Sequence, residues 1–215
     1  MRSTAEIDIE KRAAAQAAAE LVQDGATVGL GTGSTVAHLL PALAARRLDI
    51  RCAATSPATE SAARALGLVV EPLDRLGPLD IAIDGADQIA PDRWLVKGGG
   101  GAHTREKIVA AAARRFVVIA SSDKLVASLA PPVPLEILVF GATATLAATA
   151  PTELRDVAPT PDGNLIADYL GAIGDPRLLA RRLSDTPGIV EHGLFEPELV
   201  SDVLVAHGTR VERLT

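Results

Sequence analysis

The chain has 215 residues, a length that fits one large domain or a medium domain with a small one. Its net charge of −6 argues against a protein that binds the phosphate backbone of a nucleic acid, and an aromatic content of 2% leaves few side chains on which bases could stack. The first residues contain acidic side chains and no continuous apolar segment, so they do not predict a signal peptide. No apolar run approaches the roughly 20 residues that span a bilayer. We therefore expect a cytoplasmic protein that binds neither nucleic acid nor membrane.

Residues 5–24 predict the first helix. Ser3 and Glu6 fit a capping box at its start, and Gly25 fits the position just beyond its end. Lys11 lies in the first half of this helix. The helical pattern alone leaves open whether Lys11 is a solvated surface lysine or part of a binding site.

Residues 27–35 predict a strand and a glycine-rich turn that leads into a second helix. Such a turn can hold a phosphate group, and the hydroxyls of Thr32, Ser34 and Thr35, next to Gly33, suit a phosphate monoester or a sugar hydroxyl. The turn matches neither the Walker A pattern nor the dinucleotide-binding fingerprint. A tight turn with a Ser or Thr helix cap would use the same residues, so both interpretations remain open.

Short apolar runs predict further strands at residues 50–54, 68–70, 79–83 and 116–120. Helices are expected between them at residues 58–66, with Ser56 as its N-cap and Pro57 at its first position, and at about residues 104–113. Cys52, the single cysteine, lies in one of the apolar runs, which predicts a small buried side chain and excludes a disulfide within the chain. Apolar strands that alternate with helices predict a Rossmann-like parallel sheet with helices on both faces.

Ligands of such sheets bind beyond the carboxyl ends of the strands. Asp84 and Asp87, in the sequence DGAD, follow one predicted strand, and Lys124 follows another. Each of these residues also fits a solvated turn, so their position alone does not decide between binding and a simple loop.

A proline-rich segment at residues 130–134 predicts a boundary between domains. We expect a catalytic α/β domain of residues 1–130 and 201–215 and a small α+β domain of residues 131–200. The small domain has the order β-α-β-β-α-β, which is typical of a ferredoxin-like unit. Its predicted elements cover residues 135–140, 142–148, 154–157, 165–169, 176–183 and 188–195. The run 203–206 is expected to return to the large sheet.

The sequence KGGGGAHTREK, residues 97–107, is the strongest candidate for a functional site. Its glycines, among them Gly98 and Gly99, allow the backbone to approach another group closely, and a predicted helix follows at once. Glu106 has a cationic residue on each side. The sequence shows no metal-ligand spacing and no serine nucleophile elbow. These features favour acid–base chemistry on a phosphorylated small molecule without a metal or an organic cofactor.

Five ordered motifs resemble those of type A ribose-5-phosphate isomerases. They are GLGTGST (29–35), DGAD (84–87), KGGGGAHTREK (97–107), SSDK (121–124) and PGIVEHGLF (187–195), and the weaker GNLIAD (163–168) also fits. The resemblance implies interconversion of D-ribose 5-phosphate and D-ribulose 5-phosphate through an enediol(ate), in the non-oxidative pentose phosphate pathway. It also implies a homodimer or homotetramer.

The resemblance also implies roles for individual residues. Glu106 would be the base, and Lys97 the cation that stabilises negative charge on the substrate. Asp84 and Asp87 would hold sugar hydroxyls and assist ring opening. The residues implied in substrate binding are Lys11, Thr32, Gly33, Ser34, Thr35, Lys97, Gly98, Gly99 and Lys124.

Two other functions remain as alternatives. A non-catalytic sugar-phosphate sensor on a related fold would bind the phosphate but would not need Glu106 in this motif. An acyl-CoA transferase on a related fold would use a glutamate as nucleophile and would take a CoA thioester. His103, inside the glycine-rich motif, stands where the family often has a small or apolar residue, and the sequence leaves its role open.

Overall fold

The structure is a computed structural model that describes residues 3–214, and it divides into two compact units. The large unit contains the chain up to Ala86, then Arg105–Lys124, and the chain from Glu198 onward. The small unit contains Asp87–Thr104 and Leu125–Pro197. Among the described residues, no helix combines the length and apolar character needed to cross a bilayer.

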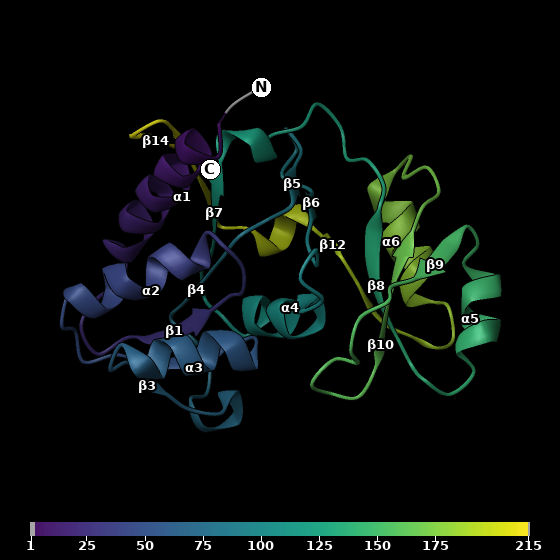
Figure 1. Ribbon diagram of the computed structural model, residues 1–215, viewed down its shortest axis with the longest axis horizontal. Coiled ribbons are helices and arrows are strands. Elements are labelled where there is room, and N and C mark those ends of the chain that lie inside the picture. Colours follow the sequence, from purple (N-terminus) through teal and green to yellow (C-terminus); the bar gives the residue numbers. More distant parts are fainter. Residues whose placement is uncertain (1–2, 215) are drawn as a thin grey trace. The chain divides into compact units, whose positions relative to one another are not determined.

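The large unit is built on a seven-stranded sheet with the order β14-β13-β7-β4-β1-β2-β3 (Figure 1). All neighbouring strands run parallel except β14, which pairs antiparallel with β13. This arrangement confirms the predicted Rossmann-like sheet and the return of the last apolar run to it. The strands are β1 (Thr27–Leu30), β2 (Arg51–Ala54), β3 (Val69–Val70), β4 (Ile81–Asp84), β7 (Phe116–Ser121), β13 (Asp202–His207) and β14 (Arg210–Leu214).

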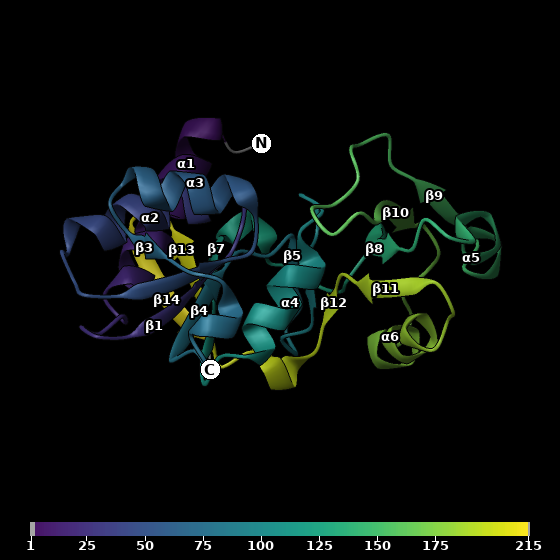
Figure 2. The same ribbon diagram turned by 90° about the horizontal axis from the view of Figure 1, so that it is seen from below.

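Helices cover both faces of this sheet. Three of them, α1 (Thr4–Ala19), α2 (Val36–Ala45) and α3 (Pro57–Ala65), lie together on one side of the strands (Figure 2). The helix α4 (His103–Ala111) packs on the other face. Its contact with β1 is close, since a Cβ atom at Gly29 of β1 would lie 2.4 Å from Cγ1 of Val109. The absence of a side chain at Gly29 therefore lets α4 lie directly on β1.

The first helix begins as predicted but ends early. Ser3 and Glu6 form the expected capping box, whereas the helix stops at Ala19 rather than at residue 24. The guanidinium of Arg46 donates hydrogen bonds to the carbonyls of Ala19 and Val22, the latter at 2.6 Å. The side chain that follows α2 thus adds hydrogen-bond donors to the carbonyls at the end of the first helix.

The small unit contains the predicted ferredoxin-like arrangement. Its four-stranded sheet has the order β11-β8-β10-β9 and is antiparallel throughout. Leu179 and Leu183 of α6 belong to the same buried cluster as Val133, Leu135 and Ile137 of β8. The elements are β8 (Val133–Ile137), α5 (Ala142–Ala148), β9 (Thr152–Leu154), β10 (Leu165–Tyr169), α6 (Pro176–Ser184) and β11 (Ile189–His192).

A three-stranded sheet also belongs to the small unit, with the order β12-β6-β5. It consists of β5 (Gln88–Ile89), β6 (Leu95–Val96) and β12 (Leu194–Phe195). The predicted strand 188–195 is therefore two strands, separated at Gly193. The Gly193 amide donates to the carbonyl of Pro134 at 2.7 Å and its carbonyl accepts from the Lys97 amide at 2.8 Å, so the chain changes partner there.

This sheet changes the expected division of the chain at residues 130 and 200. Residues 87–104 and 125–130 group with the small unit, and residues 198–200 group with the large one. The pairing of β6 with β12 draws the segment after Asp87 toward the small unit. Short 3-10 turns occur at Leu73–Arg75 (η1), Ser122–Lys124 (η2) and Pro197–Leu199 (η3).

Candidate active site

The loop after β1 is fixed to the end of β4. The Gly31 amide donates to the carbonyl of Ile83 at 3.0 Å, and Oδ1 of Asp84 accepts from the Thr32 amide at 3.1 Å and the Gly85 amide at 2.7 Å. Asp84 is only 3% exposed. A Cβ atom at Gly31 would lie 1.9 Å from Cγ of Asp84, so this position requires glycine. The structure therefore brings two of the predicted motifs together at one edge of the sheet.

The side chain of Thr32 points into a cluster of hydroxyls. Its Oγ1 lies 2.7 Å from Oγ1 of Thr55 and 3.3 Å from Oγ1 of Thr59, and Thr59 donates to the carbonyl of Gly31 at 3.0 Å. Thr55 and Thr59 follow β2, the strand next to β1, and our sequence reasoning did not select them. Thr55 does come directly after the strand next to β1, and this position was an available signal.

The other residues of this loop differ in exposure. Gly33 and Ser34 are exposed, whereas Thr35 is buried. Thr35 is the N-cap residue of α2 but makes no side-chain hydrogen bond to the helix. The alternative interpretation of this turn, a Ser or Thr cap, therefore does not account for the hydroxyls. Ser34 and the backbone of Gly33 stay accessible to a ligand.

A buried carboxylate links the first helix to the loop after β7. Glu10 has no exposed surface, and it accepts hydrogen bonds from the Ser122 amide at 2.9 Å, the Ser122 hydroxyl at 3.0 Å and the Gly208 amide at 2.8 Å. Lys11 is its neighbour on α1, and Lys124 ends the η2 turn that Ser122 begins. Glu10 thus ties together the two segments that carry the predicted phosphate-binding lysines.

Both lysines are partly exposed. Lys124 has 34% of its side chain exposed, and its Nζ lies 3.6 Å from Oδ2 of Asp123. Lys11 is half-buried on α1. Neither side chain is fully buried in the core of the large unit, so both positions are compatible with ligand binding.

Glu106 lies in the first turn of α4 and is 6% exposed. A carboxylate is favoured there because the first amides of a helix carry partial positive charge. One turn later, Val109 and Ala110 are buried and hold the helix against the sheet. The sequence therefore places this carboxylate on a rigid element of the large unit.

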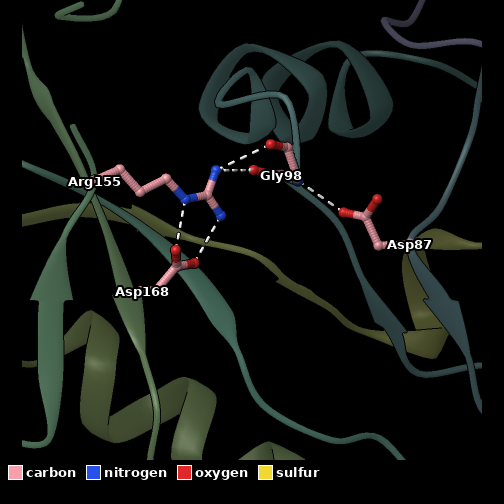
Figure 3. Close-up of polar contacts among 5 residues, drawn as sticks. Asp87, Gly98, Arg155 and Asp168 are labelled. Carbon is pink, nitrogen blue, oxygen red and sulfur yellow. Dashed lines mark hydrogen bonds and ion pairs between the residues drawn. The ribbon is translucent and has the colours of Figure 1, made fainter. Parts of the chain in front are cut away.

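The glycine-rich loop before α4 belongs to the small unit. Gly98 has a φ of 104°, which favours glycine, and the Gly99 amide donates to Oδ2 of Asp87 at 2.7 Å (Figure 3). Lys97 is 3% exposed, and its Nζ lies 5.4 Å from the centroid of the Phe195 ring. The ring face attracts the ammonium group and helps to hold it in this buried position.

Two residues that sequence reasoning missed hold the same loop. Arg155 donates from Nη1 to the carbonyls of Gly98 and Gly99, both at 3.0 Å, and its Nε and Nη2 bind the carboxylate of Asp168 at 2.6 and 2.7 Å (Figure 3). Asp168 ends the weak motif GNLIAD, which was the only sequence signal for this pair.

His103 packs beneath the glycine-rich loop. It has no exposed surface, and a Cβ atom at Gly98 would lie 2.6 Å from its Nδ1. Its Nε2 lies 3.4 Å from the carbonyl of Glu191. The imidazole thus fills space under the loop.

Each unit therefore carries part of the predicted set. The large unit holds Asp84, Glu106, the hydroxyl-rich loop and both lysines, and the small unit holds Lys97, the glycines and Asp87. Carboxylates, ammonium groups and amides of this kind can transfer a proton and hold an anion. Within the described residues, no group of three or more His, Cys, Asp or Glu side chains is arranged to hold a metal ion.

Comparison with known proteins gives the same assignment from three directions. The family model for ribose 5-phosphate isomerase A (phosphoriboisomerase A) matches residues 51–210. Ribose-5-phosphate isomerase A of Caulobacter sp. (strain K31) is 46% identical over 203 residues, which cover 87% of this chain and 90% of that protein. The ribose 5-phosphate isomerase A structure from Methanocaldococcus jannaschii has a TM-score of 0.90 and 34% identity, and covers 95% of this chain and 97% of its own.

A further similar structure is a D-ribose-5-phosphate isomerase in complex with phospho-erythronic acid. It has a TM-score of 0.91 and 31% identity, and the match covers 100% of this chain and 99% of that chain. Matches of this length and identity extend over both units, so they concern the whole chain and not one motif. This chain belongs to the ribose 5-phosphate isomerase A family.

Proposed function

We propose that this chain interconverts D-ribose 5-phosphate and D-ribulose 5-phosphate with Glu106 as the base. The observation that carries the proposal is the buried Glu106 in the first turn of α4, directly after the glycine-rich loop. A carboxylate held on a rigid helix meets the main requirement of an aldose–ketose isomerase, which is one base that removes a proton and returns it.

The proposed reaction moves one proton between neighbouring carbons. Glu106 takes the proton from C2 of the open-chain aldose, and the electrons of that C–H bond form the C1–C2 double bond of an enediol(ate). The carbonyl oxygen at C1 gains a proton as the hydroxyl at C2 loses one. Glu106 then returns its proton to C1, which leaves the carbonyl at C2 and restores the carboxylate.

Negative charge grows on the substrate oxygens during this reaction, and we assign its stabilisation to Lys97. A buried ammonium interacts with such charge more strongly than one in water, because the local dielectric is low. The contact of Lys97 with the Phe195 ring supports this role, because the ring face attracts the ammonium group and fixes its position. Asp84 and Asp87 are proposed to hold sugar hydroxyls and to assist ring opening.

We assign the phosphate group to the large unit. The exposed Ser34 and the backbone of Gly33 are suited to phosphate oxygens, and Lys11 and Lys124 add positive charge. Thr32 and Thr35 are proposed to support this loop, with the Thr32 hydroxyl already held by Thr55. Gly98 and Gly99 are proposed to lie against the sugar.

Assembly and location are also proposals. We expect a homodimer or homotetramer, as the resemblance to the family implies. A cytoplasmic location is likewise an expectation. The two alternatives, a sugar-phosphate sensor and an acyl-CoA transferase, are not favoured by the comparisons, which extend over the whole chain with proteins named as isomerases.

A coupled assay that consumes ribulose 5-phosphate tests the activity. The purified chain should convert ribose 5-phosphate with saturable kinetics, and it should convert unphosphorylated ribose far less efficiently because the phosphate provides much of the binding energy. A CoA thioester should not be consumed. Binding of ribose 5-phosphate without any turnover would contradict the isomerase and favour the sensor.

A further inference from the structure

We propose that Arg155 is a positioning residue that sets the orientation of the glycine-rich loop, with Asp168 holding Arg155 in place. This inference rests on the proposed function, because it concerns the loop that we place against the sugar. It adds two residues that lie more than 50 positions from the loop in sequence, since Arg155 is separated from Gly98 by 57 positions.

The guanidinium of Arg155 is shared between two partners. One edge, Nε and Nη2, forms a two-point ion pair with the Asp168 carboxylate on β10, and the remaining nitrogen, Nη1, donates to two successive carbonyls of the loop. The side chains of Arg155 and Asp168 are 19% and 21% exposed, so the pair is largely shielded from water. A two-point pair of this kind fixes the plane of the guanidinium as well as its position.

The peptide between Gly98 and Gly99 is held from both sides. Its carbonyl oxygen accepts from Arg155 at 3.0 Å, and its amide donates to Oδ2 of Asp87 at 2.7 Å. Figure 3 shows Arg155 and Asp87 on opposite sides of this peptide. A cation on the oxygen and an anion on the amide hydrogen oppose any rotation of the peptide plane.

The next peptide, between Gly99 and Gly100, is held by its carbonyl oxygen alone. Because a trans peptide is planar, its C=O and N–H bonds point in opposite directions, so the Gly100 amide must point away from Arg155. Gly100 is exposed, and a Cβ atom there would meet nothing within 4 Å. A cation on the carbonyl also polarises the peptide and makes its amide a stronger hydrogen-bond donor.

Glycine makes this clamp necessary. The four-glycine run has no side chains that could fix its backbone, and it would otherwise sample many conformations. Arg155 limits that freedom together with the Gly101 amide, which donates to the Gly98 carbonyl at 3.0 Å, and the Asp87 carboxylate. The function we infer is to present the Gly100 amide to the oxygen on which negative charge develops in the enediolate.

Lysine could not replace this arginine. Lysine has a single ammonium group on a flexible stem and cannot bind a carboxylate at two points while donating to two carbonyls in a fixed direction. The variants Arg155→Ala and Arg155→Lys therefore separate the loss of the side chain from the loss of its planar geometry. Arg181→Ala is the matched control, because Arg181 lies in the same unit with 83% of its side chain exposed.

The test measures kcat and KM with ribose 5-phosphate for the wild type and these variants, with thermal unfolding recorded for each. Loss of a well-placed donor to developing charge should lower kcat by about 100-fold in Arg155→Ala, with little change in KM. Arg155→Lys should fold like the wild type and still lose about 10-fold or more in kcat, since the charge remains but the fork does not. Arg181→Ala should match the wild type.

Chemical rescue distinguishes positioning from simple support of the fold. Guanidinium ion at millimolar concentration should restore part of the kcat of Arg155→Ala in a saturable way, whereas methylammonium at the same concentration should not. Asp168→Asn should lower the same parameter, kcat, by a smaller factor. If Arg155→Ala does not fold, Arg155→Lys and Asp168→Asn still test the proposal through kcat.

Three results would overturn the role of Arg155. They are a kcat within twofold of the wild type in both arginine variants, a loss that appears in KM alone, and a loss that follows the fall in unfolding temperature without rescue by guanidinium. The wild-type reaction in the same series separates this outcome from failure of the proposed function, because absence of wild-type turnover would reject the isomerase itself.

Discussion

Glu10 provides a sharp test of how the large unit supports its lysines. Its carboxylate is fully buried and accepts hydrogen bonds from the amides of Ser122 and Gly208 and from the Ser122 hydroxyl. Glu10→Ala would remove this acceptor from the amides of Ser122, which is half-buried, and of Gly208, which is exposed. We expect this change to destabilise the protein more than any substitution on the exposed face of α1.

The magnitude follows from these hydrogen bonds. A hydrogen bond to a charged group contributes about 1.5–3 kcal/mol, and water can replace part of it at Ser122 and Gly208, so we expect a cost of about 2 kcal/mol for Glu10→Ala. For a chain of this size that corresponds to a fall in the unfolding temperature of about 4–8 °C. Glu10→Gln keeps one oxygen acceptor and should cost about half as much. Glu20→Ala is the control, since 74% of the Glu20 side chain is exposed.

Two assays check this prediction. Circular dichroism during heating measures the unfolding temperature, and the coupled assay at a temperature where all variants stay folded measures KM and kcat. We expect KM for ribose 5-phosphate to rise more than kcat falls, because Glu10 orders the turn that carries Lys124. The reasoning would be refuted if Glu10→Ala unfolded within 2 °C or so of Glu20→Ala, against the shift expected for a chain of this size.

Two further predictions concern ionisation in the large unit. Burial raises the pKa of Asp202, but hydrogen bonds and charge from Arg213 and Arg115 outweigh it and leave the pKa below its ordinary value. The stabilisation from these interactions is complete above the unfolded pKa of about 3.9 and is lost as the pH falls through the lower folded pKa. Asp202→Asn should therefore lower the free energy of unfolding by about 1–3 kcal/mol at pH 7 and by progressively less in acid. A difference in urea unfolding that does not change with pH would contradict this prediction. Burial raises the pKa of the Cys52 thiol to about 12, so a thiol reagent at pH 8 should modify Cys52 only after unfolding, and rapid reaction of the native protein would show the prediction to be wrong.

Local sequence signals predicted most of the fold. Ser56 and Pro57 start α3 as expected, because capping depends on neighbouring residues alone. The break at Gly193 was not predicted, since it depends on the pairing of β12 with β6, a contact nearly 100 positions away in sequence (Leu194 with Val96). The end of α1 was missed for the same reason, because the side chain that follows α2, Arg46, adds hydrogen bonds to its terminal carbonyls.

The candidate site shows the same division between local and distant information. The glycine-rich motifs and Asp84 could be found because glycine marks close approach of the backbone, which the contact of Gly31 with Asp84 confirms. Arg155 could not be found, because the residues around it carry no motif and its partners, Gly98 and Asp168, come from separate segments. The inward direction of the Thr32 hydroxyl likewise depends on Thr55, which belongs to another strand end.

The central claim is that Glu106 moves the proton between C1 and C2, and one comparison of rates tests it most directly. The coupled assay with ribose 5-phosphate should be run on the wild type and on Glu106→Gln, with Glu153→Gln as an exposed control. The account predicts that Glu106→Gln lowers kcat by about 10²–10⁴-fold while calorimetry shows nearly unchanged binding of ribose 5-phosphate. Turnover by Glu106→Gln close to that of the control would contradict the assignment of the base.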